Sequence, residues 1–372
     1  MLFVAVVLTT VAMACSAPAA SPGTSVTITA TASASTRPST QTSPSTTASS
    51  SAPAQVPTTT SPSAPATATV SIPTTVYVPT AAPYKPSDAQ LELFQYVLSL
   101  INKDRQDAGL PAVMLDYNAA AQKHAQDMFD NYYCSHWGTD GLKPYMRYTM
   151  EGGLNFEGEN SSYSGWYNPA DNPADYAPID VRQEIAELER MMVYEDAGAN
   201  NGHRDTILNK WAKQVSLGIV YDTKRLAFVE QFEGQYVEYF LPPALSGNIL
   251  SLSGRFTAPG IALNNISIAY DPSPQALTNS QLVNDAAYTD GYSLGTRVNY
   301  IISPPPPGQT YGNLPAQAIQ ASRWDVNESG QFFVQADISR SLVRGKGVYT
   351  VVIVAAIGGE SVNLTNYSIF VK

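Results

Sequence analysis

The sequence predicts an α+β domain followed by an all-β sandwich domain, with a disordered stalk ahead of both. Residues 16–85 are almost entirely Ser, Thr, Ala and Pro, a composition that cannot bury a packed core. In residues 86–240 helical patterns come first and strand patterns later, which favours α+β over an alternating βαβ order. In residues 241–372, from about Ile249 onward, only strand patterns are found.

Residues 1–15 resemble a secretory signal segment. Residues 2–14 are apolar, too short to span a bilayer comfortably, and end in small residues before Cys15. Cys15 also resembles a bacterial lipoprotein cysteine, so a lipid anchor at this residue is the one membrane contact expected. Cleavage near Ala14 and a retained anchor are the alternatives. Each of these predicts an extracellular or cell-surface protein.

The charge of the chain is concentrated in residues 86–240. This region carries 24 acidic and 12 basic side chains, whereas residues 241–372 carry seven of each. Such an acidic region argues against nucleic acid or an anionic membrane surface as a partner. It is compatible with cation binding and equally with a solvated acidic surface.

Three helices are predicted in residues 86–240 from residue patterns at helical spacing, and the first two also have a capping residue at their start. The first follows a capping box of Ser87 and Gln90 and ends before Gly109. The second and third are residues 118–129, capped by Asn118, and residues 180–195.

Strand patterns follow the helices. Residues 214–222 and 225–233 alternate in polarity around a turn and predict an antiparallel hairpin. Later apolar segments, separated by Pro, Gly and Asn, predict a small sandwich of immunoglobulin-like architecture. These segments are residues 265–271, 296–302, 331–338, 347–357 and 366–372.

One motif in this β region is misleading. Residues 291–295, GYSLG, match the nucleophile-elbow pattern of α/β-hydrolases. That fold places its catalytic histidine after the serine, and no histidine follows Ser293. We interpret the match as a chance occurrence in a loop.

All three histidines lie in residues 86–240. His124 falls inside the second helix and is interpreted as a helix-surface or packed residue, whereas His136 lies in a Gly-containing loop and His203 at the start of a short helix. Two histidines and a carboxylate on separate elements could converge on a divalent cation, since these ligands suit Zn²⁺. A structural role for His203 is the alternative. Cys134 is interpreted as a structural cysteine, with a Cys/His dyad with His136 as the alternative.

Four motifs carry a family resemblance: "LINKDRQDAGLPAVMLDYNAAAQKHAQDM", "CSHWGTDGLKPYMRY", "GEN" and "NNGHRDTILN". In this order they resemble the CAP superfamily, also called SCP-like, which includes the cysteine-rich secretory, antigen and pathogenesis-related proteins. The resemblance covers about residues 88–234. It implies an α-β-α sandwich around a small antiparallel sheet, with a cavity lined by two His and two Glu that in some members bind Zn²⁺ or another divalent cation.

The resemblance implies a metal-ligand set in this chain. By motif, it comprises His136 in "SHW", Glu159 in "GEN" and His203 in "GHR". The second Glu, which microbial members often lack, is best matched by Glu195, with Glu189 or Asp196 as alternatives. The Trp usual near that position is replaced by Met, and the disulfides of eukaryotic members are absent. Residues 161–180 are interpreted as an ordinary surface loop, with a loop over the same cavity whose aromatic residues shape its rim as the alternative.

Three functions follow as hypotheses. The first is a surface-displayed binding module that holds a small molecule, lipid, peptide or glycan in this cavity. The second is a metal-assisted hydrolase in which an ion at His136, Glu159 and His203 activates water. The third is a structural envelope protein with a vestigial cavity. No catalytic residue is assigned, because no H-E-x-x-H helix occurs and no nucleophile is visibly paired with a base.

Overall fold

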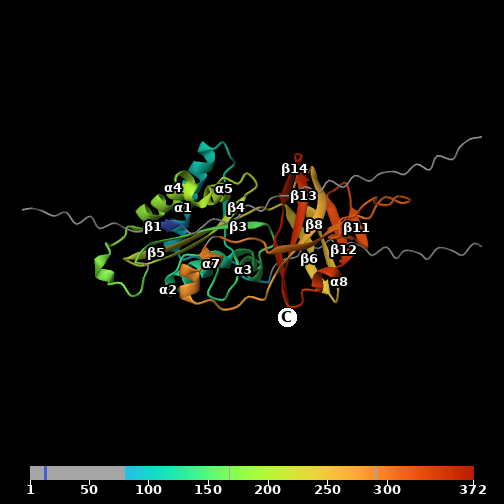
Figure 1. The fold of residues 1–372 in the computed structure, drawn as a ribbon. Helices are drawn as coiled ribbons and strands as arrows, with labels where there is room; N and C mark the ends of the chain where they lie inside the picture. The colour runs from blue at the N-terminus through green and yellow to red at the C-terminus, as the bar shows by residue number, and fades with distance from the viewer. Residues whose placement is uncertain (1–11, 15–79, 167, 290) are drawn as a thin grey trace, which may run out of the picture.

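The computed structural model describes residues 12–14, 80–166, 168–289 and 291–372 (Figure 1). Most of the predicted signal segment and stalk, Cys15 included, lies outside these residues. The described residues form an α-β-α domain followed by a two-sheet β-sandwich, as the sequence predicts. Among them, no helix combines the length and the apolar character needed to cross a bilayer.

A five-stranded sheet forms the middle layer of the first domain, in the order β1-β3-β5-β4-β2. Neighbouring strands are antiparallel except for β2, which pairs with β4 in parallel. The predicted hairpin is confirmed as β4–β5. The strands are β1 (Ala12–Ala14), β2 (Met114–Asp116), β3 (Glu157–Gly165), β4 (Gln214–Tyr221) and β5 (Arg225–Glu233).

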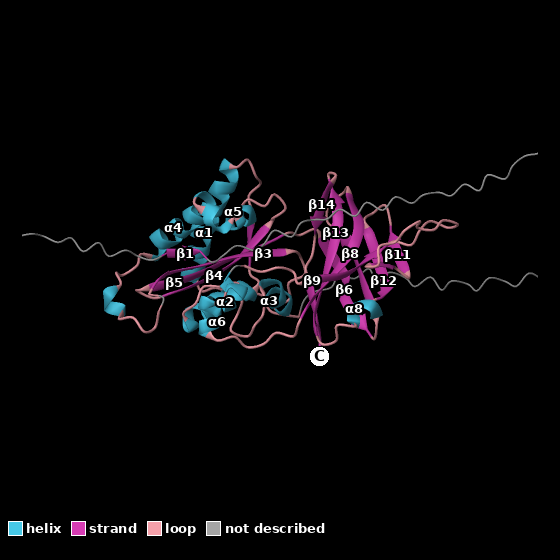
Figure 2. Ribbon diagram, viewed as in Figure 1, coloured by secondary structure: helices cyan, strands magenta, loops and turns pink. Residues whose placement is uncertain are grey.

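Helices cover both faces of this sheet (Figure 2). Because side chains alternate along a strand, β5 contributes Phe228 to the apolar cluster under α1 and α4, and Val229 to the cluster under α2. All of β5 is therefore buried. The helices are α1 (Asp88–Asp107), α2 (Ala119–Asn131), α3 (Pro144–Met150), α4 (Val181–Tyr194) and α5 (Gly202–Ile207), with the short 3₁₀ helices η1 (Pro173–Asp175) and η2 (Asp196–Ala199).

The predicted helix starts are confirmed by their caps. Ser87 and Gln90 form the capping box of α1, and the Asn118 side chain accepts a hydrogen bond from the backbone N–H of Ala120 in α2. Residues before α1 also contribute to the fold, because Tyr84 packs against Phe94 and its backbone N–H donates to the carbonyl of Tyr117. Tyr84 therefore belongs to the folded domain, although composition places it in the stalk.

The second domain consists of two sheets that pack face to face around one apolar cluster, in which Leu252, Ile268, Phe332 and Val351 are fully buried or nearly so. One sheet has the order β10-β9-β8-β13-β14, with β15 paired to β13, and the other has the order β11-β12-β7-β6. The strands are β6 (Val237–Ser246), β7 (Ile249–Phe256), β8 (Ile261–Asp271), β9 (Thr296–Ile302), β10 (Ala318–Gln320), β11 (Arg323–Val326), β12 (Gln331–Asp337), β13 (Gly347–Ile357), β14 (Glu360–Asn363) and β15 (Tyr367–Val371).

The two domains are joined directly. Three residues, 234–236, separate the end of β5 from the start of β6. The first strand of the sandwich thus begins at Val237, inside the segment that the sequence assigns to the first domain.

The second domain also contains helices, so the prediction that only strands follow Ile249 is wrong. The helices are α6 (Asn279–Asn284), α7 (Ala286–Thr289) and α8 (Ser339–Leu342). A capping box of Thr278 and Gln281 starts α6. α6 and α7 belong to residues 272–295, which connect β8 to β9 and which we name the strap. The strap leaves the sandwich and packs on the first domain, where Leu282 joins the apolar cluster under α2.

Candidate functional site

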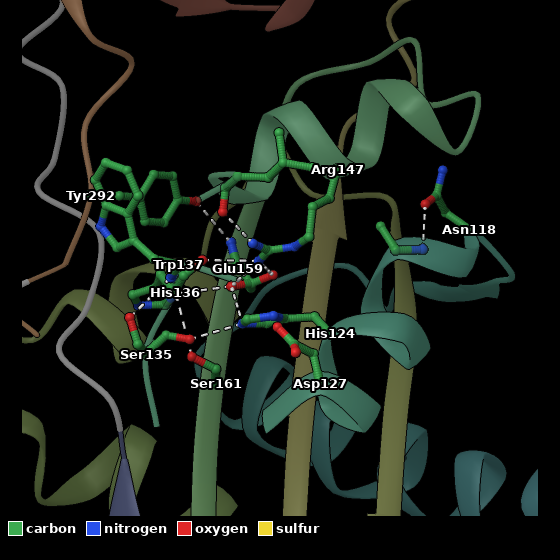
Figure 3. A network of polar contacts seen from close by, with 12 residues as sticks. Asn118, His124, Asp127, Ser135, His136, Trp137, Arg147, Glu159, Ser161 and Tyr292 are labelled. Carbon is green, nitrogen blue, oxygen red and sulfur yellow. Dashed lines mark hydrogen bonds and ion pairs between the residues drawn. The ribbon is translucent and has the colours of Figure 1, made fainter. Parts of the chain in front are cut away.

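Two of the predicted site residues meet between α2, α3 and β3 (Figure 3). Glu159 on β3 is fully buried, and its Oε1 lies 3.0 Å from Nδ1 of His136, in the turn after α2. His124 of α2 is also buried, with Nε2 3.8 Å from the same oxygen. His124 is thus a packed residue, as expected, but it packs inside the site. Cys134, weighed as a dyad partner of His136, is disulfide-bonded and offers no thiolate.

Arg147 completes this group, although no sequence motif marks it as a site residue. Pro144 begins α3, and Arg147 lies one turn further along the helix. Its Nη2 donates to both carboxylate oxygens of Glu159, at 3.0 and 3.2 Å, and to the carbonyl of His136 at 3.0 Å. Glu159 and Arg147 therefore form a buried ion pair with charge-assisted hydrogen bonds.

The charges within the group follow from these contacts. Burial acts to raise the pKa of Glu159, but Arg147, His124 and the His136 hydrogen bond together lower it to about 2. Burial and the Arg147 charge lower the pKa of His124 to about 4. His124 is therefore neutral at pH 7, and its Nε2 donates to the Ser135 carbonyl at 2.8 Å.

The strap covers this group from outside. The Tyr292 ring lies 5.0 Å from the His136 ring, centroid to centroid, and its hydroxyl accepts a hydrogen bond from the Glu159 backbone N–H at 3.2 Å (Figure 3). The Ser135 hydroxyl donates to the carbonyl of Tyr288, also in the strap. As a result, His136 is 1% exposed and Glu159 is not exposed at all.

His203 has a different partner. Its Nδ1 lies 2.6 Å from Oδ1 of Asp196. The other carboxylate oxygen of Asp196, Oδ2, accepts a hydrogen bond from the backbone N–H of Arg204. Asp196 is one of the alternatives considered for the second acidic residue. Glu195, the preferred match, has a side chain that is 55% exposed and pairs with Arg190.

Glu189, the remaining alternative, is buried beside Glu230 of β5. Burial and the neighbouring carboxylate raise the pKa of Glu189 well above its ordinary value. The Nδ2 of Asn160 donates to Glu230 and to the His203 carbonyl, both at 3.2 Å. The structure therefore pairs His136 with Glu159 and His203 with Asp196, and leaves Glu195 on the surface.

The residues around Glu159 do not fit a divalent cation. Both of its carboxylate oxygens already contact the guanidinium of Arg147, a fixed positive charge that would repel a second cation. Across the described ranges, no three His, Cys, Asp or Glu side chains are grouped as a metal site requires.

A cavity of about 590 Å³ lies beside this group, between the two domains. The start of β3, the region of α5, β14 and the strap line it. Gly158 and Gly202, which flank the predicted ligands Glu159 and His203, contribute to the lining, but His136, Glu159 and His203 do not. The cavity is thus lined by residues that precede the predicted ligands in the sequence, and not by the predicted ligands themselves.

The segment 161–180 does not lie over this cavity, so its aromatic residues form no part of the cavity rim. Residues 161–165 belong to β3, and the rest runs past the end of the sheet furthest from the sandwich (Figure 1). β3 has nine residues, a length of about 30 Å at the rise of an extended strand, and the cavity lies at its other end. Trp166 instead packs on Tyr132.

Comparison with known proteins gives a family for part of the chain. Residues 98–232 match the model of the cysteine-rich secretory protein family, CAP. Among solved structures, the CAP domain of Enterococcal PrgA aligns at 14% sequence identity and a TM-score of 0.26. The alignment covers 41% of this chain and 64% of that one, so it spans less than two thirds of the PrgA structure. No curated protein matches the sequence.

Proposed function

Because residues 98–232 form a domain of the CAP family, we propose that this protein is a ligand-binding module whose site is the cavity between its two folded domains. The observation that carries the proposal is the cavity itself. Its volume of about 590 Å³ falls within the range of roughly 300–1,000 Å³ that is typical of small-molecule sites.

The lining suits a bound organic molecule. Aromatic rings of Trp211 and Tyr236 and the aliphatic side chains of Val362 and Leu364 offer apolar surface, while Asn209 offers an amide. A mainly apolar wall with a few polar groups is the usual composition of such sites. The ligand would therefore contact residues of both domains at once.

In this proposal the His136–Glu159–Arg147 group is structural. It fixes β3, whose first residues form one wall of the cavity, through a buried ion pair and the Tyr292 contact. The hydrolase alternative would instead require substrate access to His136 and Glu159, and both are buried beneath the strap. The signal-like start and the stalk composition support export and display outside the cell.

The test is a variant that fills the cavity. A Cβ added at Gly158 would contact only Thr206, at an ordinary 3.6 Å, so Gly158→Leu should fold and project its side chain into the cavity. We expect fragments that bind the full chain by ligand-observed NMR to lose about tenfold or more in affinity in Gly158→Leu.

Gly198→Leu is the matched control, because nothing lies within 4 Å of a Cβ at that position. It should bind the fragments as the unmodified protein does. Fragments that bind Gly158→Leu with undiminished affinity would show that the site lies elsewhere, and turnover of a bound fragment would favour the hydrolase alternative.

A further inference from the structure

The cavity is acidic. Among the described residues that line it, Glu157, Asp205 and Glu233 are acidic, and none is Lys, Arg or His. The lysines on either side of Trp211 in the sequence are already engaged: Lys210 pairs with Glu360, and Lys213 bonds the carbonyl of Gln235. The described residues that line the cavity therefore include no cationic side chain, although the ammonium groups of Lys210 and Lys213 lie over the rings of Trp211 and Tyr236.

Glu157 is the feature that points to a ligand. It is 1% exposed, lines the cavity, and neither of its carboxylate oxygens has a hydrogen-bond partner of ordinary length. Glu233 on the same wall directs one oxygen to the Tyr148 hydroxyl and leaves Oε1 without a partner. Buried carboxylate oxygens without partners are costly, and a ligand that supplies donors would remove that cost.

We infer that the interdomain cavity binds an organic cation, an alkylammonium or alkylguanidinium group on an apolar body, with Glu157 as its principal acceptor. This inference rests on the proposed function and adds the chemical class of the ligand. The cationic head would donate hydrogen bonds to Glu157 and Glu233, and the apolar body would contact Val362 and Leu364. The rings of Trp211 and Tyr292 also line the cavity.

Other ligand classes fit the lining less well. A divalent metal needs several grouped ligands, and none are grouped among the residues the structure describes. An anionic lipid would find no Lys, Arg or His among the described lining residues to pair with its charge. A neutral lipid would leave the oxygens of Glu157 without donors.

A cation bound at Glu157 would have to displace the proton of this carboxyl group. Burial and the charge of Glu159 raise the pKa of Glu157 well above its ordinary value, against the opposing effects of Arg147 and Gln231. Burial and Asp116 raise the pKa of Glu233 to about 8. Both groups thus favour the neutral carboxyl in the ligand-free protein, and a bound cation would favour the carboxylate in each.

The test uses two isosteric pairs of probes on the full chain, measured by titration calorimetry. One pair is n-pentylamine and n-pentanol, and the other is the amide of acetyl-lysine and that of acetyl-norleucine. We expect each cation to bind about tenfold or more tightly than its neutral isostere. Preference for the lysine derivative would identify a basic peptide side chain as the source of the cation, and preference for the free amine a small molecule.

Three variants make the test specific. Glu157→Gln keeps the shape of the side chain and should lose the preference for the cation, whereas Glu92→Gln, the same change at an exposed position on α1, should keep it. Asp205→Lys changes an exposed position on the rim of the cavity and should weaken cation binding. This variant takes the place of Glu157→Gln in the test if Glu157→Gln does not fold.

Equal binding of cation and neutral isostere, or an unchanged preference in folded Glu157→Gln, would overturn the inference. If both isosteres bind equally and both lose binding in Gly158→Leu, the cavity would still be the ligand site but its preference would not be for charge. If none of the four probes binds, the cation assignment fails, and the fragment experiment decides the proposed function separately.

Discussion

At the scale of single residues, a guanidinium held at a fixed position determines the chemistry of Glu159. A buried carboxylate with two histidines nearby resembles a metal site or a proton-transfer site. Here Arg147 contacts both of its oxygens and keeps it ionised without any other cation. The motif residues are therefore present, but the charge they would offer to a metal is already neutralised.

This balance predicts the effect of Arg147→Met. Removing one partner of a buried ion pair costs about 3–5 kcal/mol. The free energy of unfolding measured in urea at pH 7 should therefore fall by about this amount in the variant. In the native protein the pKa of Glu159 is lowered to about 2, so its stabilisation persists until the pH falls toward that value. In the variant a buried, unpaired Glu159 would be protonated instead, so the loss should shrink as the pH falls toward 4.5.

Arg190→Met is the control, since Arg190 pairs with Glu187 and Glu195 on the exposed face of α4 and its loss should leave the unfolding midpoint unchanged. A loss in Arg147→Met that is the same at both pH values would contradict the assignment of the ion pair to Glu159.

The sequence alone identified His136, Glu159 and His203 as notable, because each lies in a short motif. It could not identify Arg147 or Tyr292, because their roles depend on contacts across the fold. Tyr292 lies 133 positions from Glu159, and no periodicity or spacing predicts such a contact. Asp196 was considered only as an alternative to Glu195, since nothing local distinguishes which acidic residue will turn inward.

At the scale of elements, the strap is the segment that alters the site. Its short helices pack under α2, and its last residues place Tyr292 on His136. The capping box of Thr278 and Gln281 is a local signal that could have revealed α6. The docking position could not have been predicted, because it depends on an apolar face of α2 far away in the sequence.

The strap makes Tyr292→Ala informative. Loss of a buried ring should cost about 3–5 kcal/mol and should open a path to His136. We expect modification of His136 by diethylpyrocarbonate, followed by peptide mass spectrometry, to become faster in this variant. Tyr292→Phe keeps the ring and should protect His136 nearly as well.

His203 serves as an internal reference in the same experiment, because its Nδ1 contacts Asp196 and not a residue of the strap. A His136 reaction rate that is the same in Tyr292→Ala and in the unmodified protein would show that the strap does not control access.

At the scale of the whole molecule, the two domains are joined by buried polar contacts. Lys143 lies 2.7 Å from Asp271 at the end of β8, and the Tyr145 hydroxyl donates to the second oxygen of the same carboxylate. Asn366 exchanges two hydrogen bonds with the backbone of Glu157. The helix and strand order of each domain could be predicted from caps and alternation, but this interface could not, because its partners are more than 120 positions apart.

The interface predicts the behaviour of Lys143→Met. Asp271 would remain buried without its cation, so the variant should lose about 3–5 kcal/mol in urea unfolding. Calorimetry should then resolve separate transitions for the two domains. Replacing both partners, as in Lys143→Met with Asp271→Leu, should recover much of the loss, because no unpaired charge remains.

The exposed pair Lys210–Glu360 joins the same two domains and provides the control. Lys210→Met should change stability by less than about 1 kcal/mol. If Lys143→Met lowered the free energy of unfolding no more than Lys210→Met does, the buried Lys143–Asp271 pair would not stabilise the interface between the domains.

The three-residue junction between β5 and β6 also determines how the cavity can exchange its contents. Proteins that enclose a ligand between two lobes commonly have a hinge there, so that the lobes open for entry and close afterwards. Here a junction this short leads from one buried strand directly into the next, and the buried Lys143–Asp271 ion pair also joins the two domains. Both features oppose separation of the two domains. For the ligand proposed above, exchange would then depend on the opening of the cavity itself and not on a movement of one domain away from the other.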